Sequence, residues 1–288
     1  MTAASPHPHD AAPSSAAFFD LDKTIIARSS ALAFSRPFYA GGLITRKAVI
    51  RSAYAHFMFM AGGADHDQME RMREYLSALV SGWDVGQVRA IVEETLEGLI
   101  QPVVYQEAKA LIAEHRAAGR DVVIVSSSGS EVVEPIGAML GADRVVATRM
   151  AVENGRYSGR IDFYAYAENK AVAIRELAQE NGYDLGDCFA YSDSATDLPM
   201  LRAVGHPTAV NPDRSLRREA ATRGWPVLDF HHPVRLRRRV ANQVTPRIPT
   251  MSLVLGTGAV LWAVLWWSSN HPVRGRARGS ARRSTVRV

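Results

Sequence analysis

The stretch FFDLDKT, residues 18–24, decides how the chain is interpreted, because two aspartates one residue apart follow an apolar run. In an extended strand, residues i and i+2 point to the same side, so Asp20 and Asp22 are expected to project together from the strand's end. Two carboxylates held so close need a cation or a shared proton. Oxygen ligands favour Mg²⁺, which binds one or two carboxylates together with the phosphate oxygens of a substrate.

Two segments further along the chain offer groups that bind phosphate. The run DVVIV, residues 121–125, predicts a buried parallel strand, and its end is followed by Ser126 and Ser127. Hydroxyl and backbone N–H groups there are expected to hold phosphate oxygens. Lys170 opens an amphipathic helix that Gly182 is placed to end. This lysine is expected to supply a fixed positive charge.

A third segment is expected to place two more carboxylates beside Asp20 and Asp22. The run CFAY, residues 188–191, predicts another buried strand, which is followed by SDSATD. Asp193 and Asp197 are four residues apart, so a helix that begins near Ala195 would let both face one pocket. In an open α/β sheet the ligand binds outside the carboxyl ends of the strands, where all these residues are expected to gather.

These motifs together resemble those of the haloacid dehalogenase-like (HAD) phosphohydrolases, in the subfamily IB branch that includes phosphoserine phosphatase. An Asp-Leu-Asp-Lys-Thr motif, a strand-end serine, a lysine and Ser-Asp-Ser-x-x-Asp occur in family order, and the likeness runs from about residue 18 to about residue 230. The resemblance implies an α/β fold with a Rossmann-like parallel sheet core and an inserted helical cap. It also implies a Mg²⁺ cofactor and a phosphoaspartyl mechanism.

The resemblance implies a role for each motif residue. Asp20 looks like the nucleophile and a Mg²⁺ ligand, and Asp22 looks like the general acid/base that also offers its backbone carbonyl to the metal. Asp193 would be a further metal ligand, and Asp197 would orient the metal shell or Lys170. Phosphate binding falls to Ser126, Ser127 and Lys170. From the chemistry of the loop, Thr24 is expected to fix its conformation and Lys23 to face solvent.

About a hundred residues separate the first motif from Ser126, far more than a strand-to-helix connection needs. The domain boundaries predicted are a core of residues 17–28 and 105–230 and a cap of residues 29–104. In this family a cap closes over the site and selects the substrate. Ser29 and Arg36 are the candidate substrate residues, although the usual role of such an arginine is a solvated helix face. Four cap helices are predicted, over residues 29–39, 46–61, 67–80 and 85–100.

One position departs from the phosphoserine phosphatases. Those enzymes carry an acidic residue nine positions after the nucleophile, where this chain has Ser29. Without that carboxylate the substrate ammonium loses a strong partner, so phosphoserine is predicted to be a poor substrate. A second feature agrees with the family, because Asn154-Gly155 between two apolar runs predicts a two-residue hairpin turn.

The two ends of the chain differ in composition from its centre. Residues 1–16 are rich in Ala, Pro, Ser and His and predict a disordered tail without the features of a signal peptide. From Arg235 onward there are 11 arginines and no acidic residue, which leaves 23 basic and 29 acidic residues before that point. The catalytic region is therefore acidic, and nucleic acid is not expected as its partner. The single cysteine, Cys188, excludes a disulfide within the chain.

The C-terminal part predicts contact with a membrane. A basic linker, residues 231–250, precedes an apolar segment, residues 251–268, and a basic tail, residues 269–288. The apolar segment is close to the minimum length for a spanning helix. Its tryptophans gather toward one end and arginines lie on both sides of it, as at an interfacial anchor. A spanning helix, a helix in the membrane plane and a helix buried in protein remain open. The expected location is the cell membrane with a cytoplasmic catalytic domain, and a soluble cytoplasmic protein is the alternative.

The function predicted from the sequence is a Mg²⁺-dependent phosphomonoester hydrolase. Its partner would be a small phosphorylated substrate, and tethering at a membrane makes a lipid phosphate one candidate. Two alternatives remain. The first is a phosphotransferase that passes the phosphoryl group to an acceptor other than water. The second is a regulatory binding module of the same fold with little turnover.

Overall fold

The strand that precedes the two aspartates lies in the middle of a seven-stranded sheet. This strand, β1, pairs in parallel with β2 on one side and β5 on the other, and the strand order is β4-β3-β2-β1-β5-β6-β7. Among the strands that the structure describes, β3 and β4 are the one pair that runs antiparallel. The bounds are Ala16–Phe19 for β1, Asp121–Gly129 for β2, Arg144–Glu153 for β3, Arg156–Phe163 for β4, Phe189–Ser192 for β5, His206–Val210 for β6 and Val227–Leu228 for β7.

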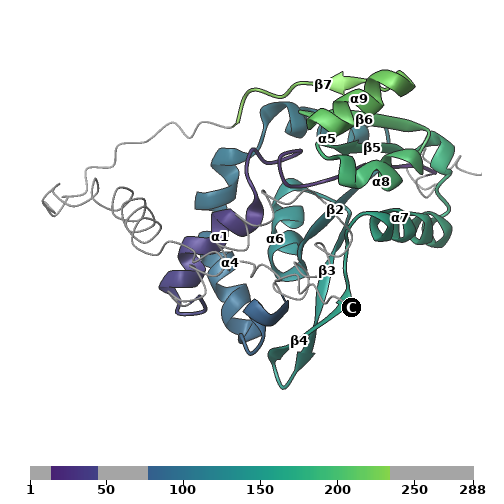
Figure 1. The fold of residues 1–288 in the computed structure, drawn as a ribbon. Helices are drawn as coiled ribbons and strands as arrows, with labels where there is room; N and C mark the ends of the chain where they lie inside the picture. The colour runs from purple at the N-terminus through teal and green to yellow at the C-terminus, as the bar shows by residue number, and fades with distance from the viewer. Residues whose placement is uncertain (1–13, 45–76, 234–288) are drawn as a thin grey trace, which may run out of the picture. The chain divides into compact units, whose positions relative to one another are not determined.

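The structure is a computed structural model that describes residues 14–44 and 77–233, which belong to one compact unit (Figure 1). Several sequence predictions fall outside these ranges. They are the N-terminal tail up to residue 13, the cap helix over residues 46–61, most of the one over residues 67–80, and the linker, apolar segment and basic tail after residue 233. No helix within the described ranges is long and apolar enough to span a bilayer.

Helices cover both faces of the sheet, and the alternation of residues along β1 explains this. Ala17 and Phe19 belong to a buried cluster with residues of α1, α4, α5 and α6, whereas Ala16 and Phe18 belong to a cluster with residues of α7, α8 and α9. Figure 1 shows these two groups of helices on opposite sides of the strands. The helices are α1 Ser30–Ala40, α4 Val85–Ile100, α5 Gln106–Ala117, α6 Ser130–Leu140, α7 Glu168–Asn181, α8 Leu198–Arg202 and α9 Arg214–Arg223. Short 3₁₀ turns are η1 Gln101–Val103, η2 Leu185–Asp187 and η3 Ala195–Asp197.

The chain order of the strands creates a switch point at the centre of the sheet. The chain runs from β1 outward through β2 and β3, and later returns to the other side of β1 to add β5, β6 and β7. Loops at the carboxyl ends of β1 and β5 therefore diverge and leave a crevice between them. This topology confirms the predicted α/β fold with a mostly parallel central sheet.

Local signals in the sequence agree with the elements formed. Asn154 and Gly155 both have positive φ, 51° and 75°, as a type I′ turn between β3 and β4 requires. Gly182 adopts the left-handed conformation that ends α7. Within the segment between β1 and β2, α1 and α4 coincide with two of the four predicted helices and pack against each other, and the cap itself stays a prediction.

Candidate active site

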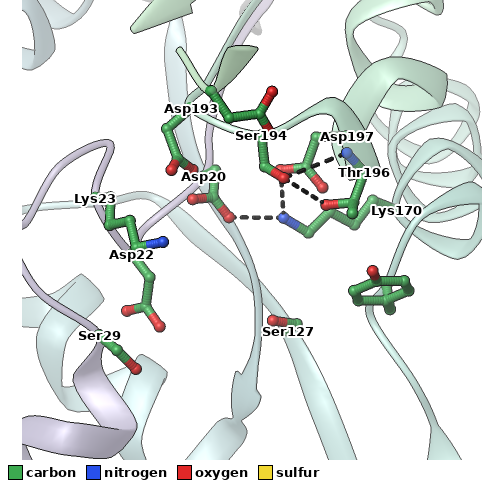
Figure 2. A pocket seen from close by; sticks show the side chains of 12 residues that line it. Asp20, Asp22, Lys23, Ser29, Ser127, Lys170, Asp193, Ser194, Thr196 and Asp197 are labelled. Atoms are coloured by element: carbon green, nitrogen blue, oxygen red, sulfur yellow. Dashed lines mark hydrogen bonds and ion pairs between the residues drawn. The ribbon is translucent and has the colours of Figure 1, made fainter. Parts of the chain in front are cut away.

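A cavity of about 250 Å³ opens at the carboxyl ends of β1 and β5. Figure 2 shows that carboxylates gather around it with two lysines and several hydroxyl groups. The residues that line it are Asp20, Asp22, Lys23, Ser29, Ser127, Tyr166, Lys170, Asp193, Ser194, Thr196, Asp197 and Asp213. They come from segments far apart in the sequence, mostly from loops that follow a strand or precede a helix, and Ser127 lies near the end of β2. The parallel sheet is therefore what assembles the site.

The buried cation Lys170 joins two of these carboxylates. Its Nζ lies 2.6 Å from Asp20 Oδ1 and 2.8 Å from Asp197 Oδ2, and all three side chains are buried (Figure 2). The hydroxyl of Ser192 donates to the same Asp197 oxygen at 2.7 Å. Asp20 is also anchored through its backbone, because its N–H donates to the Tyr191 carbonyl of β5 at 2.9 Å.

Burial and charge act against each other in this group. Burial works to lower the pKa of Lys170, but Asp20 and Asp197 outweigh it and raise that pKa, so the ammonium form is kept. Burial raises the pKa of Asp20 to about 7, against the attraction of Lys170 and with further repulsion from Asp197 and Asp193. A bound cation would relieve this repulsion and favour the ionised carboxylate.

Asp22 is held from a different direction. Its Oδ1 accepts the backbone N–H of Ser30 at 2.8 Å, and the Ser128 hydroxyl lies 3.4 Å from Oδ2. Burial raises the pKa of the Asp22 carboxyl group, while hydrogen bonds from Ser30 and Ser29 oppose the shift. A raised pKa favours the protonated form, which a proton donor needs.

Asp193 lies at the pocket with its oxygens available. Among the residues that the structure describes, none donates a hydrogen bond to its side chain, and burial raises its pKa to about 6 while the Lys23 charge opposes this. Lys23 is exposed, as expected, and it also lines the pocket, which was not predicted. Figure 2 shows Lys23 on the same side of the pocket as Asp22 and Asp193.

The donor set suits a hard cation. Asp20 and Asp193 offer carboxylate oxygens, and the loop after β1 adds the Asp22 carbonyl, which together match the oxygen ligands that Mg²⁺ prefers. The described residues contain no cluster of three His, Cys, Asp or Glu side chains in ligand geometry. Such a cluster is not needed for Mg²⁺, because this ion keeps several waters and takes only one or two carboxylates.

Some predicted site residues lie elsewhere. Ser126 is buried in β2 and accepts the Ser128 N–H at 3.2 Å, whereas its neighbour Ser127 lines the pocket. Arg36 is exposed on α1 and does not line the pocket. The Thr24 hydroxyl is buried without a hydrogen-bond partner in the described part of the chain, so no hydrogen bond supports its predicted role in fixing the loop.

Besides Lys23, four lining residues were not predicted from the sequence. Ser194 and Thr196 are part of the SDSATD motif, whose carboxylates alone were interpreted. Tyr166 lies in the loop two residues before α7, where no motif in the sequence indicated a site residue. Asp213 follows β6 and caps α9, accepting from the N–H groups of its first turn. Its signal was present, since a carboxylate after a buried strand had already been the criterion for Asp20 and Asp193.

Comparison with known proteins is consistent with this geometry. The family model described as haloacid dehalogenase-like hydrolase matches residues 17–202. A Streptomyces azureus protein named inhibition of morphological differentiation protein is 62% identical over 260 residues, which cover 89% of this chain and 94% of that protein. A protein of Mycobacterium tuberculosis strain ATCC 25618 / H37Rv, named a probable phosphatase, is 58% identical over 254 residues, which cover 87% of this chain and 88% of that protein.

Solved structures share the architecture. A Bordetella pertussis Tohama I protein with unknown function has a TM-score of 0.68 at 30% identity, over 75% of this chain and 99% of that chain. A phospho-aspartyl intermediate analogue of phosphoserine phosphatase has a TM-score of 0.55 at 19% identity, over 78% of this chain and 96% of that chain. At that identity the second likeness shows the fold alone.

Proposed function

Because the chain belongs to the haloacid dehalogenase-like hydrolase family, we propose that it is a phosphatase that hydrolyses a small phosphomonoester through a phosphoaspartyl intermediate on Asp20. One observation carries the proposal. The buried Lys170 lies between Asp20 and Asp197 in a pocket that Asp22 and Asp193 also line. The two carboxylates share the one positive charge of Lys170. The pocket can therefore still accept the positive charge of a metal ion together with the oxygens of a phosphoryl group.

In the first step Asp20 is the nucleophile. Lys170 occupies Oδ1, which leaves Oδ2 to form a bond to phosphorus. As that bond forms, the bond from phosphorus to the ester oxygen breaks, and its electron pair stays on the leaving oxygen. Asp22 donates its carboxyl proton to that oxygen, so the alcohol leaves neutral.

In the second step the roles reverse. Asp22, now ionised, accepts a proton from a water molecule as that water attacks the phosphorus atom. The bond from phosphorus to the Asp20 oxygen breaks, and inorganic phosphate forms while Asp20 returns to a carboxylate. Lys170 keeps its charge beside the phosphoryl oxygens throughout, because its raised pKa prevents loss of its proton.

Mg²⁺ is the proposed cofactor. Asp20, Asp193 and the Asp22 backbone carbonyl would hold it, and when bound it would neutralise negative charge on the phosphoryl oxygens. Serine phosphate is proposed to be a poor substrate because Ser29, which lines the pocket, carries no charge to pair with an ammonium group. The membrane tether and a lipid phosphate substrate rest on residues 251–268 and stay predictions.

The test is phosphate release by the full-length chain from a panel of phosphomonoesters, lipid phosphates included, with Mg²⁺ and with a chelator. We expect release that depends on Mg²⁺ and that Asp20→Asn lowers by more than about a thousandfold. Asp162→Asn, at an exposed position of β4, is the matched control and should retain activity. Addition of alcohols would reveal transfer to an acceptor other than water. Unchanged release by Asp20→Asn, or no release from any compound by folded protein, would overturn the proposal.

A further inference from the structure

The N-terminus of α1 is capped by a residue outside the helix. Ser29 occupies the N-cap position, but its side chain makes no capping hydrogen bond. The N–H of Ser30, the first helical residue, instead donates to Asp22 Oδ1 at 2.8 Å. N–H groups of a first turn have no partner within the helix, and the N-cap side chain normally supplies one. Asp22 takes over this task for α1, although it lies eight positions before Ser30.

The other oxygen of Asp22 meets a hydroxyl from the sheet. Ser128 of β2 lies 3.4 Å from Oδ2, and its hydroxyl is also 2.8 Å from that of Ser30, which is fully buried. Figure 2 shows the Asp22 carboxyl group pointing toward Ser29 at the start of α1. The two oxygens of Asp22 are therefore approached from two different elements, which restricts rotation of the carboxyl group.

We propose that Ser30 and Ser128 are positioning residues, which fix the orientation of the Asp22 carboxyl group for proton transfer. The proposal rests on the proposed function, in which Asp22 exchanges a proton with the ester oxygen and then with water. The Ser30 N–H engages Oδ1 at 2.8 Å, whereas the Ser128 hydroxyl stays farther from Oδ2, at 3.4 Å, so Oδ2 is the oxygen for the exchanged proton. A general acid must stay within hydrogen-bond reach of its target, so a carboxyl group free to rotate would lose much of its effect.

The backbone at Ser30 allows this N–H to be removed by itself. Proline has no N–H but is favoured at the first position of a helix. The residue before a proline must be extended, and Ser29 already has φ −71° and ψ 129°. Ser30→Pro thus removes the hydroxyl and the N–H, whereas Ser30→Ala removes the hydroxyl alone. The difference between the two variants reports the N–H bond to Asp22.

The readout is kcat/KM for two aryl phosphates of similar size, phenyl phosphate and 4-nitrophenyl phosphate, with Mg²⁺ and the full-length chain. Nitrophenolate leaves readily without a proton, whereas phenolate depends on the acid. We expect Ser30→Pro to lower kcat/KM for phenyl phosphate at least about tenfold below Ser30→Ala, and to change the value for 4-nitrophenyl phosphate less than about threefold. Ser128→Ala should shift the ratio in the same direction, and Ser35→Ala on α1 should leave it unchanged.

If these serines only stabilised the fold, the variants would lower kcat/KM equally for the two esters. Equal losses on both esters, or identical ratios for Ser30→Pro and Ser30→Ala, would overturn the proposal. Circular dichroism of each variant checks that α1 and the rest of the fold are retained.

A second measurement does not require activity. Exchange of the Ser30 amide proton, followed by NMR in the full-length chain, should become at least about tenfold faster in Asp22→Ala and stay unchanged in Asp20→Asn. If the wild-type protein hydrolyses neither ester, the proposed function fails, but this exchange still decides whether Asp22 is held by α1. Unchanged exchange in Asp22→Ala would overturn the inference.

Discussion

Lys23 adopts a backbone conformation that suits glycine better than lysine. Its φ is 62°, and a non-glycine residue in the left-handed region costs about 1 kcal/mol. Lys23→Gly should therefore raise the free energy of unfolding by up to about 1 kcal/mol above that of Lys23→Ala. Both variants remove the same charge, so only the strain differs between them. Urea denaturation measures the difference, and equal midpoints would contradict the argument.

At the residue scale, charged motifs could be predicted and their supporting hydroxyls could not. Asp20, Lys170 and Asp197 stand out because buried charges need partners, and the structure pairs them. Ser30 and Ser128 carry no such signal, because serine is common at helix starts and in loops. Their contact with Asp22 depends on where α1 begins relative to β2, which no local sequence pattern specifies.

At the element scale, the close approach of η2 to the start of β6 leaves no room for a side chain at Gly205. A Cβ at Gly205, just before β6, would overlap the carbonyl oxygen of Gly186 in η2. Gly205→Ala should lower the free energy of unfolding by about 2 kcal/mol or more. Gly98→Ala on the exposed side of α4 is the matched control, because a Cβ there meets nothing within 4 Å. The free energy of unfolding of Gly98→Ala should rise by up to about 1 kcal/mol, because alanine favours the helix more than glycine does. Thermal unfolding measures both variants, and equal melting temperatures for Gly205→Ala and Gly98→Ala would contradict the prediction.

Most described elements follow from simple patterns in the sequence. β1, β2 and β5 are short apolar runs, and the Asn154-Gly155 turn predicts the β3–β4 hairpin. The strand order was not predicted, because pairing between distant strands has no local signal. The register shift between Ser126 and Gly129 likewise has no signal in the sequence pattern.

At the scale of the whole molecule, His115 links stability to pH. It is buried in α5, where its Nδ1 accepts from Arg120 at 3.2 Å and its Nε2 lies 2.8 Å from the Tyr191 hydroxyl. Burial, reinforced by Arg120, lowers the His115 pKa from 6.5 to about 4. The folded state therefore resists protonation, while the unfolded chain takes up a proton below about pH 6.5. The stabilisation by neutral His115 is complete above that pH and is lost as the pH falls toward 4.

The stability advantage of the wild type over His115→Gln should shrink by up to about 3 kcal/mol between pH 7 and pH 4. Urea denaturation at several pH values measures it, and His206→Gln controls for the loss of a histidine. Asp20 and Asp193 have raised pKa values and act in the opposite direction, so the comparison between variants isolates His115. A constant difference across this range would show that His115 does not carry the effect.

The central claim is that Asp20 becomes phosphorylated during turnover. The direct measurement is to mix the full-length chain with 4-nitrophenyl phosphate and Mg²⁺, to quench with acid within one turnover, and to locate phosphate by peptide mass spectrometry. We expect one base-labile phosphoryl group on the peptide that contains Asp20, and none in Asp20→Asn. Turnover without phosphate on that peptide, or with phosphate on another residue while Asp20→Asn stays active, would contradict it.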